Sequence, residues 1–271
     1  MLRALEQIRR MRGGAQSHLM RCSDGHYYVV KFQNNPQHRR ILVNELLGTH
    51  LAARLGLPTA PAAVVDVPAE LIRLTPDLMI ELGRGKFPCQ AGLQFGSRYP
   101  GDPRALTLHD FLPDEQLREV ENLHDFPGML VFDKWTCNTN GRQALFFPGP
   151  RGGPERPAMT YRTMMIDQGF CFNAGEWNFP DAPLRGLYAR QRVYEGVIGM
   201  ESFEPWLERL RSRITETVLD DLSKQVPPEW YGDDQDALFR LFEHLLRRRG
   251  RVSELLLSAR HSVRQPFPNW K

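Results

Sequence analysis

Cysteine is scarce in this sequence, and long apolar runs are missing. The four cysteines among 271 residues are widely separated and form neither a CxxC pair nor a zinc-ligand spacing with histidine. This pattern argues against a structural zinc site and a disulfide scaffold, and it fits a reducing compartment. No stretch approaches the roughly 18 apolar residues of a membrane span, and the basic N-terminus lacks the apolar core of a signal peptide. We therefore expect a soluble, cytoplasmic protein.

An excess of charge of one sign is also missing. The chain has 35 Lys and Arg against 32 Asp and Glu, which gives a net charge of +3. That balance is too small to indicate a nucleic-acid partner. The apolar and charged fractions, 41% and 25%, are typical of a soluble globular protein. The length allows one large domain or two lobes.

The N-terminal part predicts a β-hairpin. Strands are expected around residues 18–22 and 26–32, because Asp24-Gly25 between them is a strong turn signal. Lys31 ends the second strand, where its amine could reach a phosphate, although a solvated edge charge is the alternative. A short glycine-containing loop precedes the hairpin and could bring backbone N–H groups close to phosphates. It consists of Gly13, Gly14, Ala15, Gln16 and Ser17 and does not match GxGxxG.

A long helix is expected next. Asn35 is the predicted N-cap, Pro36 takes the first helical position, and Gly56 ends the helix. Glu45 lies among the apolar positions of this helix. A buried carboxylate there needs a cation, and Lys31 is the candidate, unless Glu45 is partly exposed.

The rest of the chain predicts an α+β protein with two lobes. Further strands at 59–68 and 78–82 complete a small β-rich N-lobe over residues 1–85 with its one long helix. Residues 86–105, rich in Gly and Pro, read as a linker without regular structure. Residues 106–271 form a larger, mainly helical C-lobe, with helices expected at 107–125, 126–135 and, as one long element, 203–226.

Two short motifs in the C-lobe carry the chemistry. Asp133 is followed five positions later by Asn138, and an apolar strand delivers Asp167 after a strand at 144–147 and a polar, proline-rich stretch at 148–158. Phosphoryl transfer needs a carboxylate beside the attacking hydroxyl and oxygen ligands for magnesium. An Asp and an Asn on one loop, with a strand-end Asp, can supply that set. The alternative is that these residues only cap turns.

In order and spacing, the sequence resembles the HipA-like kinases, especially their compact branch, and more distantly the phosphatidylinositol kinases. The resemblance covers roughly residues 10 to 190, and its most specific parts are FDKWTCNTNGR and MMIDQGF. Further matching segments are GGAQS, VVKF, NELLGTHLAARLGLP and QFGSRYPGD.

This resemblance implies a two-lobed kinase fold with ATP and Mg²⁺ in the cleft. Lys31 would contact the α- and β-phosphates with Glu45 holding it, and the backbone of residues 13–17 would cover the phosphates. Asp133 would accept the proton of the acceptor hydroxyl, and Lys134 beside it could neutralise the transferring phosphate.

The same resemblance assigns the metal and the regulation. Asn138 and Asp167 would bind magnesium. Ser17 becomes a candidate for autophosphorylation, because HipA-like kinases are regulated in that loop.

The expected function is transfer of phosphate to a Ser or Thr hydroxyl of a protein, in a toxin-like setting with an antitoxin-type regulator as one partner. A lipid or small-molecule kinase is one alternative. A nucleotide-binding pseudokinase that serves as an interaction module is another, and the complete set of Asp133, Asn138 and Asp167 argues against it.

Overall fold

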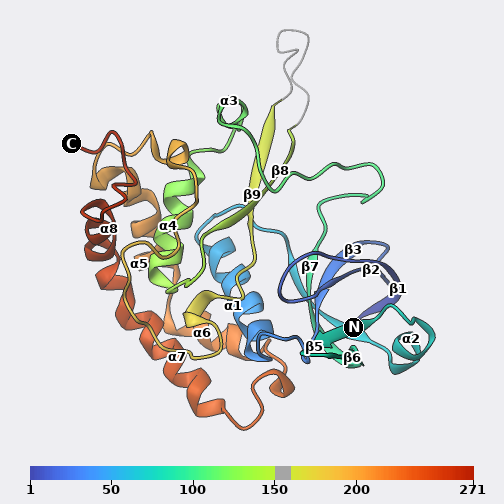
Figure 1. Ribbon diagram of the computed structural model, residues 1–271. Helices are drawn as coiled ribbons and strands as arrows, with labels where there is room; N and C mark the ends of the chain where they lie inside the picture. Colours follow the sequence, from blue (N-terminus) through green and yellow to red (C-terminus); the bar gives the residue numbers. More distant parts are fainter. Residues whose placement is uncertain (150–159) are drawn as a thin grey trace.

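A closed five-stranded β-barrel forms the N-terminal part of the computed structural model, which describes residues 1–149 and 160–271. Its strands follow the order β1-β2-β3-β7-β4 (Figure 1), with bounds Leu2–Arg10, His18–Cys22, Tyr27–Lys31, Gly92–Arg98 and Ala62–Val67. All neighbours pair antiparallel except β1 and β4, whose parallel pairing closes the barrel. The predicted hairpin at residues 18–32 is confirmed.

The segment expected to be a linker contains regular structure. Residues 86–105 include β7 and most of β6 (Gly85–Pro88), which pairs with β5 (Met79–Leu82). Gly96 of β7 packs so closely on its neighbour that an added Cβ would lie 2.6 Å from Cγ2 of Val65. The glycines that looked like linker residues therefore allow close packing within the barrel, and the interpretation of 86–105 as irregular is wrong.

Helix α1, Arg40–Arg54, lies between the barrel and the remaining helices in Figure 1. It starts later than predicted, because the side chain of Asn35 accepts hydrogen bonds from the backbone of Gln37 and His38 and so closes a separate turn. The predicted end is confirmed: Gly56 has a φ of 75°, the left-handed conformation that glycine adopts without strain.

The helical part contains α4 to α8, preceded by the single-turn α3. The bounds of α3 to α8 are, in order, Asp114–Leu117, Asp125–Trp135, Glu204–Arg213, Glu216–Ser223, Gln235–Arg248 and Val252–Arg260. The short helix α2 of the barrel part is Ala69–Leu74. The helix predicted at 107–125 is reduced to α3. The one predicted at 203–226 is two helices, because Thr215 caps α6 by accepting from the N–H of Val218.

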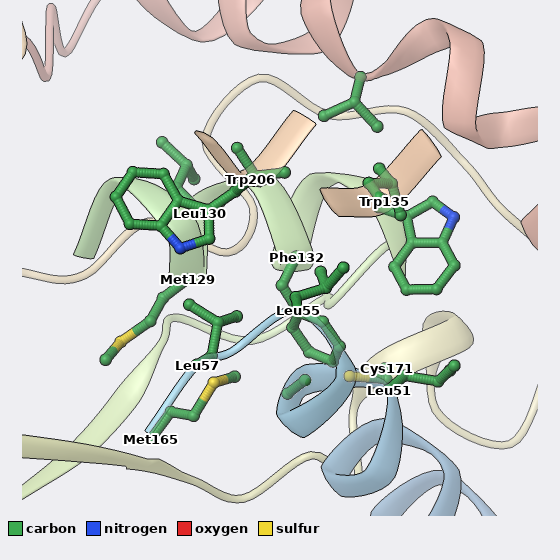
Figure 2. Packing of buried hydrophobic residues seen from close by; sticks show 14 of the residues in the cluster. Leu51, Leu55, Leu57, Met129, Leu130, Phe132, Trp135, Met165, Cys171 and Trp206 are labelled. Carbon is green, nitrogen blue, oxygen red and sulfur yellow. The ribbon is translucent and has the colours of Figure 1, made fainter. Parts of the chain in front are cut away.

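Helix α4 is buried almost throughout and packs on α1, β9 and the later helices. Phe132 and Trp135 lie close to Leu51, Leu55 and Cys171 in Figure 2, and all five are fully buried. The indole N–H of Trp135 donates to a carbonyl of α7 over 2.9 Å. This core holds the end of α4 in place and with it the turn that follows.

A two-stranded hairpin completes the fold. Strands β8 (Gln143–Pro148) and β9 (Tyr161–Ile166) pair antiparallel, as the sequence predicted. Part of the proline-rich stretch between them, residues 150–159, lies outside the described residues. In the part of the chain that is described, no helix combines the length and the apolar character needed to cross a membrane.

Candidate functional site

A cavity of about 910 Å³ lies between the barrel and the β8–β9 hairpin. Val29 and Lys31 of β3 line it from the barrel side, as do Phe95 and Ser97 of β7. Residues two apart on a strand share a face, and the pairing of Lys31 with Phe95 and of Val29 with Ser97 puts all four on one face. The barrel therefore presents a wall that is charged at Lys31 and apolar towards Val29.

The hairpin forms the opposite wall with the same polarity. Gln143 and Leu145 of β8 line the cavity beside their partners on β9, Ile166 and Met164. Leu145 and Met164 make one half of this wall apolar, while Gln143 brings a polar group to the other half. The cavity thus has an apolar end and a polar end.

Lys31 joins the two walls at the polar end. Its ammonium donates to Glu45 and, over 2.8 Å, to Oδ1 of Asp167. Burial alone would lower the pKa of Lys31, but the carboxylates of Glu45 and Asp167 raise it above its ordinary value. The predicted Lys31–Glu45 pair is confirmed.

Glu45 also holds the segment that follows Asp167. Its carboxylate accepts from the backbone N–H groups of Gln168 and Gly169, over 3.0 and 2.9 Å. Gly48, one turn later on α1, touches the same segment, and an added Cβ there would lie 2.7 Å from Cβ of Gln168. Helix α1 is thereby packed directly against the Asp167 segment.

Asp167 is held in the left-handed region, with a φ of 60°. This conformation is unusual outside glycine and costs about 1 kcal/mol or more, so the surrounding contacts must maintain it. Gln143 donates from its side chain to Oδ2 of Asp167 over 2.9 Å. Burial alone would raise the pKa of Asp167, but Lys31 outweighs it and holds the value at about 2. Asp167 is therefore ionised at neutral pH.

The glycine-containing loop covers the same cavity. Gly13, Gly14, Ala15 and Ser17 line it, whereas the side chain of Gln16 turns away to bond Arg10 and the backbone of Glu81. Gly13 has a φ of 119°, which only glycine adopts readily. Four of the five predicted loop residues thus lie at the cavity.

Asp133 does not lie at the cavity. It belongs to the last turn of α4 rather than to a loop, and it is 1% exposed. Its carboxylate accepts hydrogen bonds from both Nε and Nη2 of Arg142. Arg142 also donates to the carbonyl of Ile166 and to the side chain of Gln168, over 2.8 and 2.9 Å. Asp133 is thus enclosed by Arg142 and does not line the cavity, and its expected role as acceptor of a substrate proton stays a prediction.

Asn138 and Lys134 are buried as well. Asn138 donates to Asp133 and accepts from the N–H of Asn140, so it organises the turn and does not face the cavity. The ammonium of Lys134 donates to three backbone carbonyls, those of Ala182, Pro183 and Arg185. Neither residue occupies its expected role as metal ligand or phosphate neutraliser.

Instead, Gln143 lies beside Asp167 at the polar end, and Asn140 also lines the cavity. The sequence analysis missed both residues, although they follow Asn138 closely. Gln143 could have been found from the strand pattern. It lies two residues before Leu145 of the predicted strand, so both side chains face the same side of the strand. Arginines also line the cavity, namely Arg9, Arg10, Arg12 and Arg98.

These groups suit a divalent cation that is bound together with phosphates. Lys31 faces two carboxylates, and burial raises the pKa of Glu45 to about 7 whereas Lys31 holds that of Asp167 at about 2, so Asp167 carries the firmly ionised charge at the polar end. Among the described residues no three His, Cys, Asp or Glu side chains converge as a metal site. A magnesium ion would need only Asp167 and the amide oxygen of Gln143 after rotation of that amide, because Mg²⁺ typically takes its other ligands from phosphates and water.

Comparison with known proteins places this geometry in context. A model of the HipA-like kinase family matches residues 5–144, which include Lys31 and Glu45 and stop before Asp167. The kinase CtkA of Helicobacter pylori, described as proinflammatory, is similar over 95% of this chain and 96% of its own, with 13% identity and a TM-score of 0.57. A Golgi casein kinase is similar over 97% of this chain and 75% of its own, with 12% identity and a TM-score of 0.53. At these identities the likeness concerns the fold. Among curated proteins, none matches.

Proposed function

Because the chain belongs to the HipA-like kinase family, we propose that it is an ATP- and magnesium-dependent phosphotransferase with a two-lobed kinase fold. The barrel and α1 form one lobe, and the hairpin and later helices form the other. The observation that carries the proposal is the meeting of Lys31, Glu45 and Asp167 at one end of a cavity whose other end is apolar.

The two ends of the cavity support one orientation of the nucleotide. The purine ring would lie between Val29 of the barrel and Leu145 and Met164 of the hairpin, since an apolar slot favours a flat aromatic ring. The phosphates would then lie at the polar end, next to Lys31 and under residues 13–17. On β3 the apolar residue is Val29 and the charged residue is Lys31, and on β8 the apolar residue is Leu145 and the polar residue is Gln143. Each strand therefore contributes to both ends of the cavity.

Each residue at the polar end has a part in holding the phosphates. Lys31 binds phosphate oxygens while Glu45 fixes its position. The loop N–H groups around Gly13 donate to the same oxygens. Asp167 and Gln143 would hold the magnesium ion, which would supply charge neutralisation at the phosphates. Most of the catalysis comes from positioning and charge neutralisation.

The choice of a protein Ser or Thr hydroxyl as acceptor, a toxin-like role and an antitoxin-type partner rest on the family resemblance alone, and a cytoplasmic location rests on the scarce, scattered cysteines. A nucleotide-binding pseudokinase is the second candidate. It gains support from the burial of Asp133, which removes the carboxylate expected beside the acceptor.

Binding of Mg-ATP tests the proposal directly. Wild-type protein should gain thermal stability with Mg-ATP, and Lys31→Met should weaken the affinity about 10- to 100-fold, the range of one charge-assisted hydrogen bond. The exposed Lys224→Met on α6 serves as the matched control and should bind as wild type does. Equal affinity in Lys31→Met and wild type would contradict the proposed site.

A further inference from the structure

The polar end of the cavity raises a question about proton transfer. A hydroxyl that attacks a phosphate loses its proton, and kinases that act on hydroxyls place a carboxylate beside it for that purpose. Asp133 is enclosed with Arg142 and cannot serve. The described residues that line the cavity include three carboxylates, Glu45, Asp110 and Asp167, and no histidine or cysteine.

None of these three carboxylates is placed to accept that proton. Glu45 is 3% exposed and already accepts from Lys31 and from two backbone N–H groups. Asp167 is bonded to Lys31 and Gln143 and is the ligand for the metal. Asp110 follows His109, which pairs with Phe146 of β8. Phe146 lies three residues, about 10 Å, along the strand from Gln143, so Asp110 belongs to the apolar end.

Asn140 is an exposed residue of the cavity wall, and its side-chain oxygen accepts from the N–H of Gly141 over 2.9 Å. It lines the cavity from the turn after α4, and this turn is tied to the Asp167 segment by the N–H of Thr139 donating to the carbonyl of Phe170 over 3.1 Å. The carbonyl of Asn140 in turn accepts from the N–H of Gly186 over 3.1 Å. A carboxamide can orient a group by hydrogen bonding, but it does not take up a proton near neutral pH.

The cavity also has more cations than carboxylates. Arg9, Arg10, Arg12, Arg98 and Lys31 line it, five cations against three carboxylates. Arg10 is paired with Glu81, whereas Arg9 and Arg12 form no ion pair with any described residue. On the paired strands Arg10 lies opposite His18, which lies opposite Val30 next to Lys31, whereas Arg98 lies opposite Tyr28 towards the other end of β3. Guanidinium groups bind carboxylates and phosphates with good geometry.

We propose that the phosphoryl acceptor of this site is an oxyanion already ionised at neutral pH, a carboxylate or a phosphate, and that Asn140 selects it over a hydroxyl. The inference rests on the proposed function. The acceptor oxygen forms a bond to the γ-phosphorus of ATP, the bond from that phosphorus to the β-bridging oxygen breaks, and ADP leaves with the bonding pair. A carboxylate becomes an acyl phosphate, a phosphate becomes an anhydride, and no proton moves.

The test compares wild type with Asn140→Asp and Asn140→Ala, using ATP labelled in the γ-phosphate and Mg²⁺. The probes are poly-L-glutamate, inorganic phosphate and dephosphorylated casein, which distinguish carboxylate, phosphate and hydroxyl acceptors. Products are separated as hydroxylamine-labile acyl phosphate, labelled pyrophosphate and acid-stable phosphoserine or phosphothreonine. Thermal unfolding and Mg-ATP affinity are measured for all three proteins.

Wild type should label one of the oxyanion probes and leave casein unlabelled, and Asn140→Ala should lower that labelling without gaining any on casein, because it removes the carboxamide and supplies no base. Asn140→Asp should gain casein labelling about 100-fold or more, the usual contribution of a general base, and should lose oxyanion labelling through charge repulsion. Faster labelling of casein by wild type would overturn the inference. So would an absence of oxyanion labelling by wild type that binds Mg-ATP, while absence of Mg-ATP binding would overturn the proposed function itself.

Discussion

Asp133 and Arg142 form a buried ion pair that links the end of α4 to the backbone before Asp167 and to the side chain after it. Both side chains are at most 1% exposed, and the guanidinium uses its remaining N–H groups on Ile166 and Gln168. An Asp in the expected place of a catalytic base is therefore a structural residue.

We predict that Asp133→Ala destabilises the protein by about 3 to 5 kcal/mol, because it leaves the charge of Arg142 buried without a partner. Urea unfolding measures the change. Asp110→Ala, at an exposed position, should alter the free energy of unfolding by less than about 0.5 kcal/mol. A cost below about 1 kcal/mol for Asp133→Ala would show that the pair contributes little.

Gly48→Ala should weaken Mg-ATP binding. The new methyl group would lie 2.7 Å from Cβ of Gln168 and 3.5 Å from Sγ of Cys171, so α1 and the Asp167 segment would have to move apart. Such overpacking costs about 1 to 3 kcal/mol. Gly196→Ala is the matched control, because nothing lies within 4 Å of an added Cβ there. Calorimetry of Mg-ATP binding should show a loss only in Gly48→Ala, and equal affinities would mean that the segment tolerates the shift.

Asp167→Asn should remove the magnesium-dependent part of ATP affinity while the fold remains, since asparagine tolerates a φ of 60° well. Titration of ATP with and without Mg²⁺ separates the two parts. If magnesium strengthens ATP binding as much in Asp167→Asn as in wild type, Asp167 is not a magnesium ligand.

The pH dependence of that affinity follows from the pKa of Asp167, which Lys31 lowers to about 2 despite burial. The stabilising effect of the ionised carboxylate is complete above its ordinary pKa of 3.8 and is lost as the pH falls through about 2. Asp167 should therefore cause no change in magnesium-dependent binding between pH 5 and pH 8.

Lys134 should make the protein more stable at alkaline pH. Burial lowers the pKa of Lys134 to about 8, from an ordinary value of 10.5. Between these values the unfolded chain binds the proton and the folded chain does not, so the free energy of unfolding rises with pH, by on the order of 2 to 3 kcal/mol. Unfolding of wild type and Lys134→Met from pH 7.5 to 10 measures this. The rise should be absent in Lys134→Met, and parallel curves would rule the effect out.

Local patterns were sufficient for several elements and for one half of the site. The Asp24-Gly25 turn, the Gly56 helix end and the apolar runs of β8 and β9 each depend on neighbouring residues, so they were predicted correctly. The Lys31–Glu45 pair was also predictable, because a carboxylate among apolar residues needs a cation.

The other half of the site depends on contacts that are distant in sequence. The spacing of Asp133 and Asn138 is the same whether the first residue ends a helix or lies in a loop. Only the packing of α4 and the position of Arg142 decide that Asp133 is enclosed. In β7, Gly96 resembled a linker residue because its close contact with Val65 is invisible in the sequence.

The contact between Lys31 and Asp167 joins residues 136 positions apart. Closing so long a loop carries a large entropic cost, and contacts of this range tend to form late in folding. The barrel strands are complete by Arg98, so this part of the chain can acquire its pairing during synthesis before β9 has been made. Nucleotide affinity would then appear only after the barrel and the segment that follows β9 have come together.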